Sequence, residues 1–162
     1  MRSNGRAFQS QIANCPVATF ISNSPAETEA IARQISEDLV AGSVLALKGD
    51  LGSGKTLFTQ GLVAGLKSDV TVRSPTFTIV HEYQGGRLPV YHFDFFRLEN
   101  RESAERLGVE DYFFSDGVSV IEWADRFPDL IPDKARWISF EIKSEHERII
   151  ALTHHDHENS RA

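Results

Sequence analysis

Hydrophobic positions along the chain follow two different periods, and together they predict alternating strands and helices. Short apolar runs suited to strands occupy residues 17–22, 43–48, 117–123, 136–142 and 148–154. The run 43–48 lies between glycines, as a buried strand does. Residues 76–83 and 87–96 flank Gln-Gly-Gly and predict a β-hairpin.

The longest helical pattern lies between the first two strands. Apolar residues recur at i, i+4 and i+8, which gives one apolar face: Ile31, Ile35 and Leu39. Asn23 or Ser24 can cap this helix, Pro25 suits its first turn, and Gly42 is expected to end it.

Two further helical regions complete the pattern. A helix follows the second strand, with Phe58, Leu62 and Leu66 on one face, and residues 101–113 predict two short helices broken at Gly108. Strands that interleave with helices predict an α/β fold with a mostly parallel sheet and a β-hairpin region.

Length and composition place the chain among ordinary globular domains. It has 162 residues, of which 41% are hydrophobic and 25% charged. We expect one domain over residues 17–153, with flexible segments at 1–16 and 154–162. The histidines of the second segment could bind metal, but a flexible tract does not hold ligand geometry.

Partners and location are bounded by charge, apolar runs and cysteine content. The net charge of −6 and the scattered basic residues argue against direct binding of RNA or DNA by this chain alone, although it could serve a protein that binds them. No apolar run is long enough for a membrane span or a secretory signal. The single cysteine, Cys15, excludes an internal disulfide and favours a cytoplasmic location.

A glycine-rich loop between a predicted strand and a predicted helix carries the clearest chemistry. Residues 49–56 read GDLGSGKT and satisfy the pattern G-x-x-x-x-G-K-[ST] with Gly49, Gly54, Lys55 and Thr56. Glycines let backbone N–H groups surround phosphate oxygens, and the following helix presents its N-terminus to the same charge. Lys55 is expected to reach the β- and γ-phosphates, and the Thr56 hydroxyl to bind Mg²⁺.

Two acids end apolar strands and could complete such a site. Asp94 ends VYHFD, and Glu122 ends VSVIE. The carboxyl ends of strands in open α/β sheets face the ligand crevice, so either acid could hold Mg²⁺ or its water. The alternative for each is to cap a helix or pair with an arginine.

Three further features have both a structural and a functional interpretation. Residues 74–78 (SPTFT) place hydroxyls around a proline, as a nucleotide-sensing switch or an ordinary turn would. His92 shares a strand face with Asp94, and a hydrogen-bonded structural role is favoured over a catalytic one. Trp123 on its own indicates a core or rim tryptophan.

Taken together and in order, these motifs resemble the TsaE (formerly YjeE) family of bacterial ATPases in tRNA threonylcarbamoyladenosine biosynthesis. The resemblance spans roughly residues 24–152 and rests on GDLGSGKT, SPTFTIVHEY, VYHFDFFRL, ESAERLGVEDYF and VIEW. It implies a P-loop fold, ATP and Mg²⁺ as cofactors, and work with a complex of TsaD and TsaB.

The resemblance also implies roles for individual residues. It places Lys55, Asp94 and Glu122 in catalysis, and metal ligation at Thr56 and Glu122. The nucleotide-binding residues that it implies are Thr28, Gly49, Asp50, Leu51, Gly52, Ser53, Gly54, Lys55, Thr56, Ser74, Thr76, Trp123 and Arg148.

The chain departs from the family pattern at two positions. Leu57 replaces a frequent threonine, and Phe96 replaces a frequent tyrosine, so a hydroxyl is missing at each.

Three other functions are weighed against a tRNA-linked ATPase. A small-molecule or nucleotide kinase would need an arginine-bearing lid, a GTPase would need an N/T-K-x-D motif, and a non-catalytic module would bind ATP without hydrolysing it.

Overall fold

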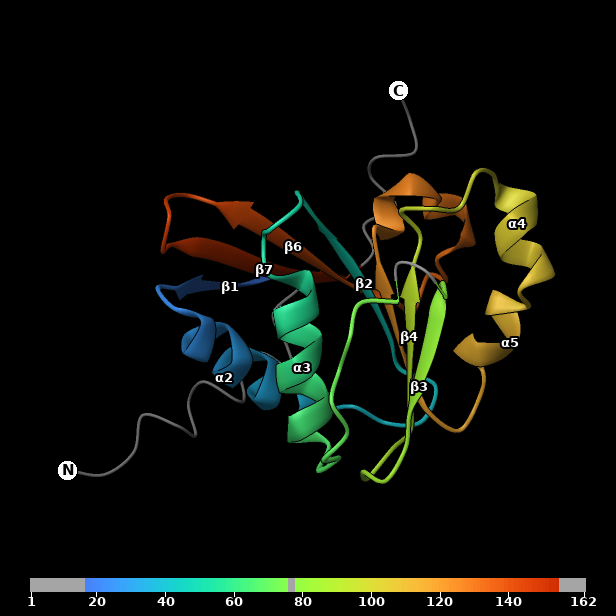
Figure 1. Cartoon of the computed structure of the whole chain (residues 1–162), viewed down its shortest axis with the longest axis horizontal. Coiled ribbons are helices and arrows are strands. Elements are labelled where there is room, and N and C mark those ends of the chain that lie inside the picture. Colours follow the sequence, from blue (N-terminus) through green and yellow to red (C-terminus); the bar gives the residue numbers. More distant parts are fainter. Residues whose placement is uncertain (1–16, 76–77, 155–162) are drawn as a thin grey trace.

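One seven-stranded sheet forms the centre of the molecule. The computed structural model describes residues 17–75 and 78–154. Its strands are β1 (Val17–Ser22), β2 (Val44–Gly49), β3 (Val80–Tyr83), β4 (Val90–Asp94), β5 (Val118–Glu122), β6 (Arg136–Ile142) and β7 (Arg148–His154). They lie in the order β1-β7-β6-β2-β5-β4-β3 (Figure 1).

The sheet is mixed, and its parallel part lies in the middle. β6, β2, β5 and β4 are parallel neighbours, whereas β3, β7 and β1 join the edges in antiparallel pairs. The predicted α/β class and the predicted hairpin of β3 with β4 are therefore confirmed. The C-terminal ends of β2, β5 and β4 meet at one edge, where ligands bind in open α/β sheets.

Helices cover both faces of this sheet (Figure 1). They are α2 (Pro25–Ser36), α3 (Lys55–Gly65), α4 (Arg101–Arg106) and α5 (Val109–Phe113), with 3₁₀ turns η1 (Ala124–Arg126) and η2 (Pro128–Leu130). Alternate residues of β2 enter two different cores. Leu45 and Leu47 pack with α2 and α3, while Val44 and Ala46 pack with α4 and α5.

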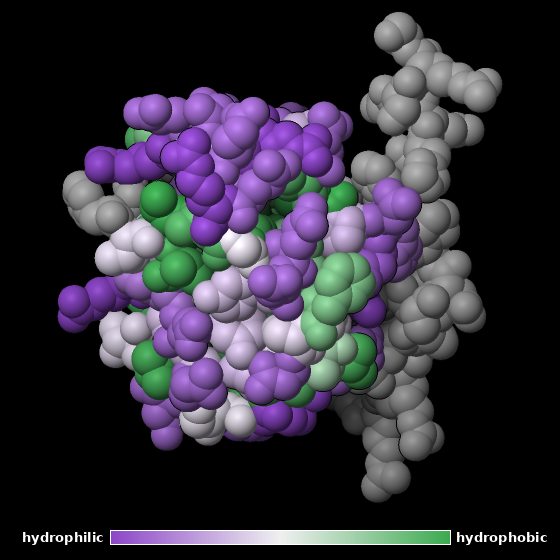
Figure 2. All heavy atoms as spheres, turned by 90° about the vertical axis from the view of Figure 1, so that its right-hand side faces the viewer, coloured by the Kyte–Doolittle hydropathy of each residue, from purple (hydrophilic) through white to green (hydrophobic). Residues whose placement is uncertain are grey.

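The two faces of the sheet differ in the helices that cover them. On one, α2 and α3 approach closely at Gly61, where an added Cβ would lie 2.5 Å from the carbonyl oxygen of Glu29. On the other, the α4 and α5 surface is mostly hydrophilic, with small separate hydrophobic areas (Figure 2). Leu107 and Phe114 are exposed near the ends of these helices.

The end of the first helix differs from the prediction. Ser24 caps α2 as expected, by accepting a hydrogen bond from the backbone N–H of Glu27. The helix then ends at Ser36, so the prediction that it continues to Gly42 is wrong. Arg87 explains the early end, because its guanidinium donates to the carbonyl oxygens of Ser36 and Leu39 at 2.8 and 2.9 Å.

The hairpin strands are shorter than predicted. β3 begins at Val80 because Ile79, a β-branched residue, has a φ of 69°, which is incompatible with a strand. The predicted break between α4 and α5 is confirmed, since Gly108 lies between them with a φ of 68°. The 3₁₀ turns were not predicted.

Some predictions concern residues outside the described ranges. These are the flexible extension 1–16 with Cys15, the tail beyond His154, and Thr76. Over residues 17–75 and 78–154, none of the helices is long and apolar enough to cross a membrane.

Candidate functional site

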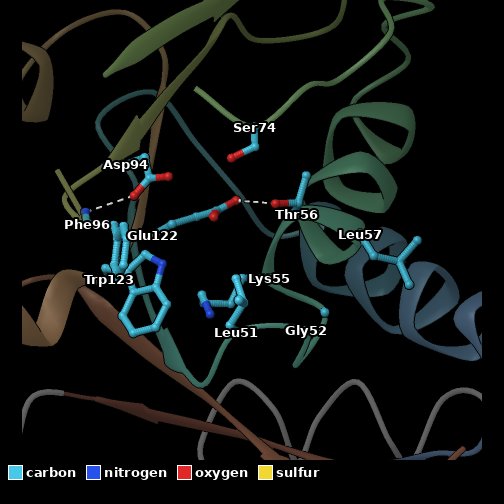
Figure 3. A pocket seen from close by; sticks show the side chains of 11 residues that line it. Leu51, Gly52, Lys55, Thr56, Leu57, Ser74, Asp94, Phe96, Glu122 and Trp123 are labelled. Carbon is cyan, nitrogen blue, oxygen red and sulfur yellow. Dashed lines mark hydrogen bonds between the residues drawn. The ribbon is translucent and has the colours of Figure 1, made fainter. Parts of the chain in front are cut away.

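A pocket of about 400 Å³ opens at the C-terminal ends of β2, β4 and β5, and we call it the main pocket (Figure 3). Most of the predicted site residues face it. Its lining consists of Leu51, Gly52, Gly54, Lys55, Thr56, Leu57, Ser74, Asp94, Phe96, Glu122 and Trp123.

The glycine loop forms one wall of the main pocket. Gly52 and Gly54 have φ angles of 78° and 105°, which favour glycine. Gly54 caps α3 without a side-chain hydrogen bond, and no acidic residue lies in the first turn of α3. The free N–H groups of this helix end are therefore suited to an anion.

Gly49 allows the glycine loop to pass close to β6, the neighbour of β2 in the sheet. An added Cβ there would lie 2.7 Å from Ser53 Oγ and 2.8 Å from the carbonyl oxygen of Phe140. Even an alanine at this position would require the loop to move. The first glycine of the motif thus fixes where the loop leaves β2.

Lys55 extends its amine beneath the loop. Nζ donates to the carbonyl oxygens of Gly49 and Asp50 at 2.6 and 3.0 Å, and it lies 4.2 Å from the centre of the Trp123 ring. Burial lowers the pKa of this amine below the ordinary value of a lysine, while nearby carboxylates, chiefly Glu122, oppose that shift. A bound phosphate would favour the charged form.

Glu122 lies at the centre of the side chains that face the main pocket. Its Oε1 accepts a hydrogen bond from Thr56 Oγ1 at 2.9 Å (Figure 3). The same oxygen lies 2.9 Å from His92 Nε2. The carboxylate is 3% exposed. The partners found for Glu122 thus differ from the helix cap or arginine that its strand-end position also allowed.

The pairing of Thr56 with Glu122 fits a magnesium ion. Both groups offer oxygen ligands, and Mg²⁺ is typically held by one or two protein oxygens together with phosphates and water. No group of three or more His, Cys, Asp or Glu residues forms a metal site within the described part of the chain. A metal here would therefore take its remaining ligands from a nucleotide and from water.

Asp94 lies beside Glu122 because the two residues are register partners on β4 and β5. Its Oδ1 accepts the backbone N–H of Phe96 at 2.8 Å, so the acid also caps the turn that follows β4. Ser74 also lines the main pocket and lies between Asp94 and Thr56 in the view of Figure 3. The cap and the pocket position are therefore compatible.

Trp123 reaches the main pocket through an unusual backbone conformation. Its φ of 56° turns the chain directly after Glu122. The indole contacts Phe96, whose ring centroid lies 4.9 Å away. Phe96, which the sequence comparison with the family marked as a departure, is thus an apolar wall of the main pocket.

A second hollow of about 260 Å³, which we call the side pocket, adjoins the main pocket. The two share Gly52, Gly54 and Leu57. Thr28 and Arg148, predicted from distant parts of the sequence, both line the side pocket rather than the main one. Arg148 donates to carbonyl oxygens of the β6–β7 turn and to that of Gly52, the latter at 3.4 Å.

The structure separates the predicted loop residues by position. Gly49 and Asp50 lie behind the main pocket, where their carbonyls accept from Lys55, and Ser53 lines the side pocket. Sequence reasoning missed Glu145 and His146, which line the side pocket from an exposed turn without any motif. It also missed Tyr83, which the hairpin register could have placed near His92.

Comparisons with known proteins converge on one family. The family model described as threonylcarbamoyl adenosine biosynthesis protein TsaE matches residues 22–150. The chain is 43% identical over 129 residues to "tRNA threonylcarbamoyladenosine biosynthesis protein TsaE" of Bacillus subtilis, covering 80% of each chain. It is 46% identical over 98 residues to the protein of that name from a Nostoc species, covering 58% of this chain and 60% of that one.

A solved structure agrees with these relatives. The fold is similar to the crystal structure of YdiB from Bacillus subtilis, with a TM-score of 0.74 and 36% identity. The match covers 84% of both chains.

Proposed function

The chain belongs to the TsaE family, and on that premise we propose that it binds ATP with Mg²⁺ and hydrolyses it in support of tRNA threonylcarbamoyladenosine biosynthesis. The observation that carries the proposal is the contact of the Thr56 hydroxyl with the Glu122 carboxylate, directly beside Lys55 and the glycine loop. This is the combination of cation, hydroxyl and strand-end acid that phosphoryl transfer requires.

We assign the main pocket to the phosphates and the side pocket to the nucleoside. Loop N–H groups and Lys55 bind the β- and γ-phosphates, and Thr56 and Glu122 hold Mg²⁺, which offsets charge developing on the phosphates. Asp94 and Ser74 face the same space and orient water. Thr28 and Arg148 contact the nucleoside because the side pocket continues from the loop at Gly52.

We propose that a protein partner activates hydrolysis. Among the described residues no arginine lines the main pocket, so the arginine that accelerates many P-loop enzymes is missing from it. From the family resemblance, we propose that this partner is the complex of TsaD with TsaB. The net charge of −6 makes direct attraction to tRNA weak, so we place contact with tRNA on the partner. We also propose a cytoplasmic location, where such a complex would meet tRNA.

Reconstituted tRNA modification tests this function. Purified TsaD–TsaB is supplied with tRNA, ATP and the precursors of the threonylcarbamoyl group, and the reaction is run with wild-type protein, with Lys55→Ala, or with neither. Wild type should sustain modification over many turnovers and form an ATP-dependent complex on a sizing column. Equal product in all three reactions, without a complex, would contradict the proposal.

A second measurement distinguishes the alternatives. Phosphate release by the isolated protein should be slow and should rise on addition of TsaD–TsaB. Transfer of phosphate to a metabolite instead of water would favour a kinase. ATP binding that supports modification with no phosphate release at all would favour a non-catalytic module.

A further inference from the structure

Two buried side chains behind Glu122 are not used in the function proposed above. His92 on β4 is 0% exposed and Tyr83 on β3 is 4% exposed. Both ring nitrogens of His92 have partners, since Nε2 lies 2.9 Å from Glu122 Oε1 and Nδ1 lies 3.0 Å from the Tyr83 hydroxyl. Glu122 is therefore contacted from the main pocket by Thr56 and from the core by His92.

The same tyrosine also holds the backbone at the start of segment 74–78. Its hydroxyl donates to the carbonyl oxygen of Arg73 at 2.8 Å and accepts from the Arg73 N–H at 3.3 Å. Arg73 directly precedes Ser74, which lines the main pocket. Burial raises the pKa of Tyr83, so the phenol keeps its proton at neutral pH.

These contacts compete for one proton. A neutral His92 that donates Nε2–H to the Glu122 carboxylate presents a bare Nδ1, which can only accept a hydrogen bond. The Tyr83 hydroxyl has a single proton, which it can donate to His92 Nδ1, to the Arg73 carbonyl or, at 3.4 Å, to His81 Nδ1. The position of the Arg73 carbonyl therefore affects how firmly His92 is held against Glu122.

We propose that Tyr83 and His92 are positioning residues, which couple the backbone of Arg73 at the start of segment 74–78 to the orientation of the Glu122 carboxylate. The inference rests on the proposed role of Glu122 at Mg²⁺. When the Arg73 carbonyl withdraws from Tyr83, the Tyr83 hydroxyl donates to His92 Nδ1 and fixes the carboxylate for metal binding. A nucleotide that contacts Ser74, the neighbour of Arg73, is thereby linked to the completion of its own metal site.

Three substitutions test the contact of His92 with Glu122 and the contact of Tyr83 with His92 separately. His92→Gln keeps an amide N–H near the position of Nε2, His92→Asn keeps one near Nδ1, and Tyr83→Phe removes only the hydroxyl. Tyr91→Phe is the matched control, because the Tyr91 hydroxyl donates to Asp116 at 2.7 Å, away from the main pocket. For each variant, hydrolysis is measured against Mg²⁺ concentration, and ATP binding is measured in EDTA.

We expect His92→Asn to raise the Mg²⁺ concentration for half-maximal hydrolysis by about 10- to 100-fold, the usual effect of losing an outer-sphere partner. Tyr83→Phe should raise it by a smaller factor, His92→Gln should restore most of the affinity lost in His92→Asn, and Tyr91→Phe should match wild type. ATP binding without metal should be unchanged throughout. The double variant Tyr83→Phe/His92→Asn should be no worse than His92→Asn alone, because the hydroxyl acts through the histidine.

Unchanged Mg²⁺ dependence in both His92→Asn and Tyr83→Phe, with an active wild type, would overturn this inference and leave the proposed function standing. Additive effects in the double variant would also overturn it. If His92→Asn does not fold, Tyr83→Phe and His92→Gln still decide the question. A wild type that neither binds nor hydrolyses ATP would instead remove the proposed function itself.

Discussion

The main pocket and the side pocket share a wall but are built from different kinds of structure. The charged groups of the main pocket come from strand ends and the start of a helix, and Lys55, Asp94 and Glu122 are at most 5% exposed. The side pocket joins the buried Thr28 of α2 to an exposed turn with Glu145 and His146. One is held by the sheet, whereas the other is completed by an exposed turn between β6 and β7.

This difference indicates a division of work. Chemistry requires charges fixed to within a fraction of an ångström, which a sheet edge provides. Binding of a nucleoside, the role that we propose for the side pocket, requires less exact placement of charges. Substitutions in the main pocket should therefore affect rate or phosphate binding strongly, and substitutions in the side pocket should affect affinity modestly.

The largest effect is expected at Glu122. Glu122→Gln keeps the shape but removes the charge that we propose holds Mg²⁺, so hydrolysis should fall by about 10²-fold or more. Circular dichroism should be unchanged, since the amide can still contact Thr56 and His92. Normal hydrolysis in Glu122→Gln would transfer the metal role to Asp94 and break the contrast between the pockets.

Lys55→Ala should have the next largest effect, on binding itself. Loss of a charge-assisted phosphate contact costs roughly 1.5–3 kcal/mol, so ATP affinity should drop by about tenfold or more. Calorimetry measures this directly, and AMP, which lacks the β- and γ-phosphates, is the control ligand. A folded Lys55→Ala protein that binds ATP normally would contradict the assignment of the main pocket.

A smaller effect is expected in the side pocket. Arg148→Ala frees the β6–β7 turn from Gly52 and should weaken ATP binding by about fivefold, the value of a single hydrogen bond of about 1 kcal/mol. The turnover of bound ATP should hardly change. Lys143→Ala is the control, because the Lys143 amine lies in the same turn but donates to Glu141 and not to the glycine loop. This variant should bind ATP like wild type. A loss of turnover in Arg148→Ala equal to that in Glu122→Gln would contradict the division between a main pocket that sets the rate and a side pocket that sets affinity.

The smallest effect concerns stability without nucleotide. Burial lowers the pKa of Lys55 in the folded state, so the unfolded chain holds this proton more tightly than the folded one. The resulting cost to stability is greatest below the lowered pKa and is relieved as the pH rises toward 10.5, the ordinary lysine value. Urea unfolding between pH 7 and 10.5 should therefore show wild type gaining stability relative to Lys55→Met as the pH rises. A difference that is constant with pH would contradict the direction of the shift.

The two pockets also differ in how well the sequence predicted them. Lys55, Thr56 and the glycines of the main pocket form a contiguous motif, and Asp94 and Glu122 end apolar strands that the periodicity revealed. Local pattern and global fold coincide there. Thr28 and Arg148 were placed only through the resemblance to a family, because 120 positions separate them in the sequence. Their proximity follows from the order of the strands, which periodicity does not determine.

The errors in the fold have the same origin. Gly42 is a reasonable helix end by local rules, but the helix ends at Ser36 because Arg87, 51 residues later, accommodates its last carbonyls. His92 and Tyr83 each suit a strand, and only the pairing of β3 with β4 brings their polar atoms together. In both cases a contact between distant residues decided what local propensity left open.

Arg87 also has a consequence for cooperativity. Its side chain donates to the carbonyl of Ser36, the last residue of α2, and to that of Leu39 just beyond it, and its backbone N–H donates to the carbonyl oxygen of Leu66 at the end of α3. The connection between β3 and β4 therefore caps the C-terminal ends of both α2 and α3, which pack on the same face of the sheet. Opening the β3–β4 hairpin would release the C-terminal ends of α2 and α3. The amide protons of the hairpin and of these two helix ends should therefore exchange with solvent as one unit.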